Sequence, residues 1–205
     1  MRKYLIREER KDERRRVEEL TRDAFWDVFK PGCDEHYILH NFRSSPDFIG
    51  ELSCVATDGE ELVGHVAYSR AVLEHENGTR THLVLAGPLS VRPDRQRQGV
   101  GSALMRFTLE KARRLGYVGA ALYGWPDYYP RFGFVPAKRF GITDEEGNSP
   151  DSLQVAEFRA GALKPGILRI SPVFFDVPPQ KVAAFDATFP PREKHVLPTQ
   201  LFKGG

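Results

Sequence analysis

The sequence is poor in cysteine and in long apolar runs, and each shortage excludes a class of protein. Its 205 residues include two cysteines, Cys33 and Cys54, whose spacing fits neither a zinc site nor a Cys-x-x-Cys redox pair. No apolar run approaches about 18 residues, so no transmembrane helix is predicted. No apolar region follows the charged N-terminus as a secretory signal requires. We therefore expect a cytoplasmic protein with reduced thiols, no membrane association and no metal site.

Net charge of one sign is also scarce. The chain has 30 Lys and Arg against 28 Asp and Glu, a net charge of +2. A dedicated nucleic-acid binder carries a large basic excess, so no nucleic-acid partner is expected. The run Arg14-Arg15-Arg16 does not change this expectation, because residues 1–30 mix basic and acidic side chains as a solvated helix face does. Hydrophobic residues make up 40% of the chain, enough to build a core.

Short-range patterns predict a mixed α/β fold. The turn signals Asp58-Gly59 and Asn77-Gly78 separate long apolar segments and indicate an antiparallel meander. The expected elements before and within it are a strand at 4–6, a helix with Asp12 as its N-cap, a helix at 35–42, and strands at 52–56, 62–73 and 82–91.

A βαβ unit is predicted after the meander. Residues 99–115 have the pattern of a helix, and a strand at 118–123 should lie parallel to the strand at 82–91. One face of this helix is expected to carry Val100, Leu104, Phe107 and Leu115. A helical turn at 126–131 and strands near 134–135 and 153–158 should follow.

Prolines divide the C-terminal part from the rest. From residue 171 onward they are frequent enough to break any long element. We therefore predict a domain at 1–170 and a Pro-rich tail at 171–205 that packs on the domain or on a partner.

The start of the predicted helix at 99–115 has the features of an anion site. Gly99 and Gly101 let an anion approach free backbone N–H groups, where the helix dipole adds positive charge. Between Arg92 and Arg114 there are 7 basic and 2 acidic residues by count. A dinucleotide fingerprint needs a third glycine where Leu104 stands, and a P-loop needs a Gly-Lys-Ser/Thr that is absent. The glycines alone leave open a helix start without a ligand.

Two motifs in this region resemble those of the GNAT superfamily of N-acetyltransferases. Gln96-Arg97-Gln98-Gly99-Val100-Gly101 is similar to the family's Gln/Arg-x-x-Gly-x-Gly/Ala signature. The segment from Tyr128 to Phe134 resembles its aromatic-Tyr-x-x-x-Gly-Phe motif, one helix and one strand later. The resemblance covers roughly residues 3–140 and is strongest to a bacterial subgroup of predicted acetyltransferases. It implies the GNAT acyl-CoA N-acyltransferase fold, an antiparallel meander followed by a βαβ unit, with a C-terminal extension.

The resemblance also implies where acetyl-CoA would bind as acyl donor. The pantetheine arm would run along the strand that contains Leu89, Ser90 and Val91. The pyrophosphate would lie on the backbone of Gln96, Arg97, Gln98, Gly99, Val100, Gly101 and Ser102. Arg92, Arg95 and Arg97 offer further positive charge. Gly87-Pro88 favours a bulge that would splay the strand and open the cleft, because proline cannot donate to a sheet ladder.

Catalytic residues are predicted less completely. Tyr129 lies where the family has its general acid, and Tyr128 is expected to pack. The strand at 81–91 has no Asp or Glu that could act as general base, and its one titratable side chain, His82, lies far from Val91. Trp125 could line the acceptor pocket or pack against the tail.

We therefore predict an acetyl-CoA-dependent N-acetyltransferase that acts on a primary amine by direct attack, as a monomer or homodimer. The alternative is a non-catalytic acyl-CoA-binding regulatory or interaction module. The sequence does not identify the acceptor.

Overall fold

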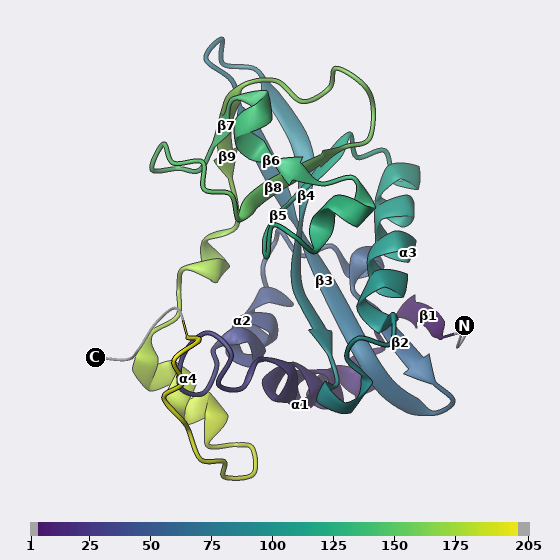
Figure 1. Ribbon diagram of the computed structural model, residues 1–205, viewed down its shortest axis with the longest axis vertical. Coiled ribbons are helices and arrows are strands. Elements are labelled where there is room, and N and C mark those ends of the chain that lie inside the picture. The colour runs from purple at the N-terminus through teal and green to yellow at the C-terminus, as the bar shows by residue number, and fades with distance from the viewer. Residues whose placement is uncertain (1–3, 201–205) are drawn as a thin grey trace.

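A computed structural model describes residues 4–200, whose strands form one nine-stranded sheet (Figure 1). The strands are β1 (Leu5–Glu8), β2 (Cys54–Asp58), β3 (Glu61–Glu74), β4 (Arg80–Val91), β5 (Gly119–Tyr123), β6 (Val135–Pro136), β7 (Ile142–Thr143), β8 (Leu153–Glu157) and β9 (Gly166–Arg169). The main order is β1-β2-β3-β4-β5-β8-β6, and β9 pairs with β3 and β7. Strands β1 to β4 are antiparallel, and β4 and β5 are parallel. This confirms the mixed fold, with a meander followed by a βαβ unit.

Helices cover both faces of the sheet. They are α1 (Arg14–Phe25), α2 (Glu35–Phe42), α3 (Val100–Arg114) and α4 (Pro179–Asp186). Side chains alternate between faces along a strand, so Cys54 and Ala56 of β2 join the core with α3, while Val55 joins the core with α1 and α2. Gly64 of β3 allows α3 to approach closely, because a Cβ there would lie 2.6 Å from Val100 Cγ1. None of the helices among the described residues is long and apolar enough to cross a membrane.

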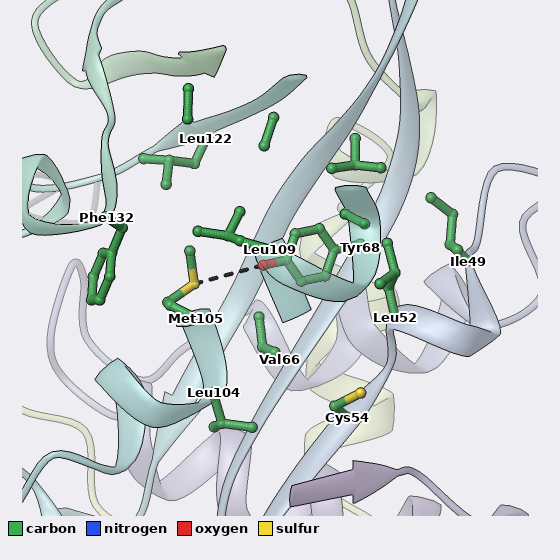
Figure 2. Packing of buried hydrophobic residues seen from close by; sticks show 14 of the residues in the cluster. Ile49, Leu52, Cys54, Val66, Tyr68, Leu104, Met105, Leu109, Leu122 and Phe132 are labelled. Carbon is green, nitrogen blue, oxygen red and sulfur yellow. Dashed lines mark hydrogen bonds between the residues drawn. The ribbon is translucent and has the colours of Figure 1, made fainter. Parts of the chain in front are cut away.

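The core under α3 is built around Tyr68 of β3 (Figure 2). Its ring is fully buried, and its hydroxyl lies 2.8 Å from Thr108 Oγ1 and 3.8 Å from Met105 Sδ.

The prediction for the buried face of α3 is partly wrong. Val100 and Leu104 are buried, but Phe107 and Leu115 are exposed. The buried face of the helix is centred near Thr108, which leaves Phe107 outside it, and Leu115 follows the last helical residue, Arg114.

The predicted N-cap at Asp12 is also wrong. A 3-10 turn at Lys11–Glu13 precedes α1, and Asp12 lies inside it with an exposed side chain. The buried Glu13 organises this end instead. Its carboxylate accepts a hydrogen bond from the Arg10 backbone N–H at 3.1 Å and pairs with Arg7 at 2.5 Å. Two arginine partners stabilise Glu13 at this position, which fixes where the helix begins.

The Pro-rich segment contains a short helix that the sequence did not lead us to predict. Helix α4 begins at Pro179, a position where the missing N–H costs nothing because the first helical donors have no intrahelical partner. Asp186 at its end pairs with Arg22 of α1 at 2.7 Å and lies 3.1 Å from His36 of α2. The segment therefore packs on the two N-terminal helices.

The C-terminal segment also holds the connection between α1 and α2. Trp26 donates a hydrogen bond to the Glu193 carbonyl at 2.9 Å, and Asp27 accepts one from the His195 backbone at 3.2 Å. Gln200 donates to the Asp27 carbonyl at 3.0 Å. Residues 179–200 thus brace residues 26–34. Residues 1–3 of the predicted domain and 201–205 of the predicted tail lie outside the described part of the chain.

A buried ionic network joins β1, α1 and α2. Arg43 pairs with Glu9 and, at 2.6 Å, with Glu18, and all three side chains are almost completely buried. Ser53 donates a hydrogen bond to Glu9 at 3.0 Å and also lies 3.0 Å from His65 Nε2. Burial holds the pKa of His65 well below its usual value, so His65 is neutral beside Arg43.

Removing one member of this network should be strongly destabilising. Arg43→Ala leaves two buried carboxylates without their cation, so we expect the free energy of unfolding to fall by about 3–5 kcal/mol. Urea denaturation followed by circular dichroism measures this change. The matched control is Arg80→Ala, because Arg80 forms an exposed pair with Glu74 and should cost less than about 1 kcal/mol. Equal losses in both variants would contradict the role of the network.

Candidate active site

A large cavity opens where β4 and β5 separate. The two strands pair only at Val84 with Ala120 and at Leu85 with Ala121. Beyond Leu85, the edge of β4 that faces β5 lines a cavity of about 1530 Å³. Small-molecule sites usually measure about 300–1,000 Å³, so this cavity has room for more than one small molecule.

A bulge in β4 produces this separation. Leu89 pairs with Val66 and Ala86 pairs with Tyr68, so β4 has one residue more than β3 between these points. The extra length falls at Gly87 and Pro88, where Gly87 has φ 141° and the peptide bond to Pro88 is cis. The predicted bulge is confirmed. It leaves the β4 edge from Ala86 to Val91 without a strand partner on the cavity side.

The N-terminus of α3 faces the same cavity with its backbone donors free. Its N-cap is Gly99 with φ 90°, and no side chain caps the helix. The first N–H groups of a helix have no intrahelical partner. A Cβ added at Gly99 would meet no protein atom within 4 Å, so the space beside the glycine is open. This geometry suits an anion such as a phosphate.

Two adjacent tyrosines lie between the helix start and the core. Tyr129 packs edge-on against Phe134 and Tyr128, with ring centroids 5.9 and 5.0 Å away. Gly124 makes room for it, because a Cβ there would lie 2.3 Å from the Tyr129 ring. Burial, with a smaller contribution from Tyr128, raises the pKa of Tyr129 to about 12. Its hydroxyl is therefore protonated at neutral pH and able to donate.

Tyr128 has a polar contact that its predicted packing role does not include. Its hydroxyl lies 3.5 Å from Ser102 Oγ in the first turn of α3. A Cβ added at Gly101 would lie 3.0 Å from the same hydroxyl. The Arg131 guanidinium stacks on the Tyr128 ring at 4.7 Å. Tyr128 therefore supports the start of α3, and Arg131 packs on Tyr128. The Tyr128-Tyr129 pair was the only signal in the sequence for this contact.

A carboxylate that the sequence analysis did not single out also lines the cavity. Glu35, the first residue of α2, accepts a hydrogen bond from the Asp34 backbone N–H at 3.0 Å. Burial raises its pKa to about 7; Asp34 adds to this shift and Lys30 opposes it. By contrast His82, the only titratable side chain on the expected strand segment, lies in a separate depression lined by Tyr117 and Arg159. Glu35 was missed because α2 and the strands β4 and β5 come to line one cavity only in the folded chain.

Comparison with known proteins decides the family. The family described as "Acetyltransferase (GNAT) domain" matches this chain over residues 5–137, well over half of its length. The chain belongs to the GNAT acetyltransferase family. It is thus a member of a family of acetyl-CoA-dependent N-acetyltransferases.

Individual relatives agree with this GNAT assignment. An uncharacterized N-acetyltransferase of Escherichia coli K12, YjhQ, is 38% identical over 85 residues, which is 42% of this chain and 46% of that protein. The chain thus aligns with less than half the length of this curated relative.

Solved structures provide a second comparison. A GNAT family acetyltransferase from Brucella melitensis, in complex with acetyl-CoA, has a TM-score of 0.69 at 26% identity over 85% of this chain and 99% of that one. The Escherichia coli protein YhbS, in complex with CoA, has a TM-score of 0.76 at 24% identity over 87% of this chain and 95% of that one. The second likeness supports the GNAT fold.

Most of the residues that the GNAT resemblance implied as donor-binding or catalytic line the cavity, but two do not. Those that line it are Leu89, Val91, Gln96, Arg97, Gly99, Val100, Gly101, Ser102 and Tyr129. Ser90 and Gln98 are not among the lining residues. Ser90 is buried and donates to Thr21 Oγ1 at 3.0 Å, and Gln98 donates to the Asp94 carbonyl at 2.9 Å.

Most of the local basic excess of this GNAT loop is neutralised. Arg92 pairs with Asp94 at 2.6 Å and Glu61 at 3.2 Å, and Arg95 pairs with Glu61 at 3.2 Å. Of the three arginines expected to add charge, Arg97 lines the cavity. The sequence count of charges therefore overstated the positive charge that a ligand would meet.

Both GNAT-domain cysteines lie away from the cavity lining. Cys33 and Cys54 are free and buried. Burial raises the pKa of Cys33 and raises that of Cys54 to about 11, so neither is a reactive thiolate at neutral pH. Among residues 4–200, no group of three or more His, Cys, Asp or Glu side chains is placed to hold a metal ion.

Proposed function

We propose that this protein transfers the acetyl group of acetyl-CoA to the nitrogen of a primary amine. The observation that carries the proposal is the cavity itself. The unpaired edge of β4 and the uncapped N-terminus of α3 meet in one space, which offers a backbone edge to an extended chain and free N–H groups to phosphates. Acetyl-CoA has both parts, and family membership supports its use.

We assign the donor half of the cavity to residues 85–102. The pyrophosphate lies on the backbone N–H groups at residues 96–102, and Arg97 adds the charge of a side chain that lines the cavity. The pantetheine arm lies along β4 at Leu89 and Val91. A backbone N–H in this segment polarises the thioester carbonyl as charge develops on its oxygen.

The chemistry follows from direct attack. The ammonium of the substrate first loses one proton to water. The neutral amine nitrogen then attacks the thioester carbon, a C–N bond forms as the C–S bond breaks, and the nitrogen loses its second proton to water. Tyr129 gives its proton to the departing sulfur and is reprotonated from water. The apolar surroundings that raise the pKa of Tyr129 also raise that of a thiol beside it, because burial disfavours both anions. This keeps the proton transfer feasible.

Ligand binding tests the donor assignment. At about 100 times its dissociation constant, acetyl-CoA should add about 2.7 kcal/mol of stability, a rise in Tm of roughly 5–10 °C for a chain of this size. Differential scanning fluorimetry measures it, with adenosine as the control because it lacks the pyrophosphate. No shift at millimolar acetyl-CoA would overturn the proposal. A shift without acetylation of any amine would favour the non-catalytic acyl-CoA-binding module.

A further inference from the structure

Charges of opposite sign line different parts of the cavity. The basic side chains that line it are Arg97 and Arg131, and Arg131 stacks on Tyr128 beside the start of α3. The acidic side chains come from α2 and from the loop after β7: Glu35, Asp144, Glu145 and Glu146. Figure 1 shows α2 and α3 on opposite sides of the long strands. The end of the cavity away from α3 is therefore acidic.

The loop carboxylates are engaged mainly with their own surroundings. Asp144 accepts hydrogen bonds from the backbone of Glu146 and Asn148 at 3.0 and 2.7 Å. Glu145 pairs with Arg169 at 3.0 Å. Burial raises the pKa of Tyr123, and the three carboxylates raise it further, so their negative field reaches the cavity wall. These three carboxylates therefore make this rim of the cavity negatively charged, but they do not form a binding site themselves.

Glu35 differs from these because, among residues 4–200, no basic side chain forms an ion pair with it. Its carboxylate accepts hydrogen bonds from the backbone N–H groups of Asp34, at 3.0 Å, and of Glu35 itself, and Lys30 favours the charged form without pairing with it. A carboxylate on a cavity wall without a cation is costly, because burial removes it from water. A cationic ligand that reached Glu35 would offset that cost.

Aromatic side chains extend from α1 to the end of β5 beside this acidic end. Phe25 and Phe29 have ring centroids 6.0 Å apart, and Phe29 stacks on Trp125 at 6.3 Å with an interplanar angle of 28°. Trp125 is 58% exposed and Phe175, also on the lining, is 69% exposed. Large aromatic surfaces left open around a cavity are suited to an apolar ligand body or to a cation over a ring.

We propose that Glu35 and the row Phe25, Phe29 and Trp125 form the acceptor subsite. The ligand class they select is a primary amine that binds as a cation, carries an aromatic or alkyl body and has no carboxylate. The ammonium binds Glu35, and the body lies on the aromatic row. A carboxylate on the ligand would meet Glu35 and the acidic rim and be repelled. This inference rests on the proposed acetyl transfer.

Calorimetric binding to the full chain saturated with CoA tests the subsite without requiring turnover. Three probes separate its parts: phenethylamine, phenylalanine, which adds a carboxylate, and 2-phenylethanol, which lacks the ammonium. We expect phenethylamine to bind at least about tenfold more tightly than either of the others, because a hydrogen-bonded charge pair is lost or opposed in both. Equal affinity for phenethylamine and phenylalanine would overturn the inference.

Two variants assign the effect to residues. Glu35→Gln keeps an oxygen for the Asp34 N–H and should weaken phenethylamine about tenfold without weakening 2-phenylethanol. Its control is Glu76→Gln in an exposed turn. Trp125→Ala should weaken both probes, whereas Phe107→Ala, at an exposed aromatic outside the cavity, should weaken neither. Unchanged binding in Glu35→Gln would contradict the assignment.

Turnover distinguishes this inference from the proposed function. Acetylated products are measured by mass spectrometry with phenethylamine, with glucosamine, whose body is polar, and with a lysine-containing peptide. Acetylation of glucosamine or the peptide but not phenethylamine would overturn the acceptor class and leave the acetyltransferase proposal intact. Binding of phenethylamine with no acetylation of any amine would overturn the acetyltransferase proposal and with it the acceptor role of the subsite.

Discussion

Tyr129→Phe should lower kcat for acetyl transfer by about 100-fold while leaving the dissociation constant of acetyl-CoA within about twofold. The effect is large because a positioned general acid contributes about 10²- to 10⁴-fold. The fold should tolerate the change, since no hydrogen bond from the Tyr129 hydroxyl supports the described part of the chain and the ring contacts with Phe134 and Tyr128 remain. Steady-state kinetics with an amine found active in the panel, together with calorimetry of acetyl-CoA, provide the measurement.

The neighbouring tyrosine is a matched control in the same motif. Tyr128→Phe removes the hydroxyl that lies 3.5 Å from Ser102, so it should weaken acetyl-CoA binding modestly and leave kcat nearly unchanged. The reverse result, a collapse of kcat in Tyr128→Phe with normal turnover in Tyr129→Phe, would move the general-acid role to Tyr128.

Gly101→Val should raise the dissociation constant of acetyl-CoA by about 100-fold. A Cβ at this position already lies 3.0 Å from the Tyr128 hydroxyl and 3.5 Å from Val91 Cγ2, and the valine methyl groups extend further into the space between them. Loss of about two charge-assisted hydrogen bonds from helix N–H groups to the pyrophosphate accounts for this magnitude. Isothermal titration calorimetry measures it directly.

The control for this variant lies on the same helix. Ala103→Val adds the same β-branched side chain to α3 at a residue that does not line the cavity, so acetyl-CoA binding should not change. Both variants should keep a Tm near that of the parent protein without ligand. Normal acetyl-CoA affinity in Gly101→Val would remove the first turn of α3 from the donor site.

The parts of the molecule that could be predicted from sequence depend on local signals. The turns at Asp58-Gly59 and Asn77-Gly78 fix the meander, and Gly99 marks the start of α3 because it adopts a left-handed conformation. The bulge was predictable since a proline within a strand cannot complete the ladder. These features build the donor half of the cavity almost entirely from one continuous stretch of chain.

The remaining features depend on packing between distant segments. Glu35 carries no motif, and only the folded chain brings this end of α2 to the wall of the cavity. The pairing of Arg92 and Arg95 with Glu61 joins residues about 30 positions apart. Long-range contacts decided these two features. Helix α4 is different, because the position of Pro179 at a helix start was a local signal that the frequency of proline obscured.

The bracing of residues 26–34 by residues 179–200 has a consequence for how specificity can change. Phe29 and Glu35 belong to or adjoin this braced connection, while the donor half is formed by β4 and α3. In the proposed assignment, the amine and acetyl-CoA are therefore held by segments that differ in what supports them. We expect substitutions in residues 179–200 to change the choice of amine more than the binding of acetyl-CoA.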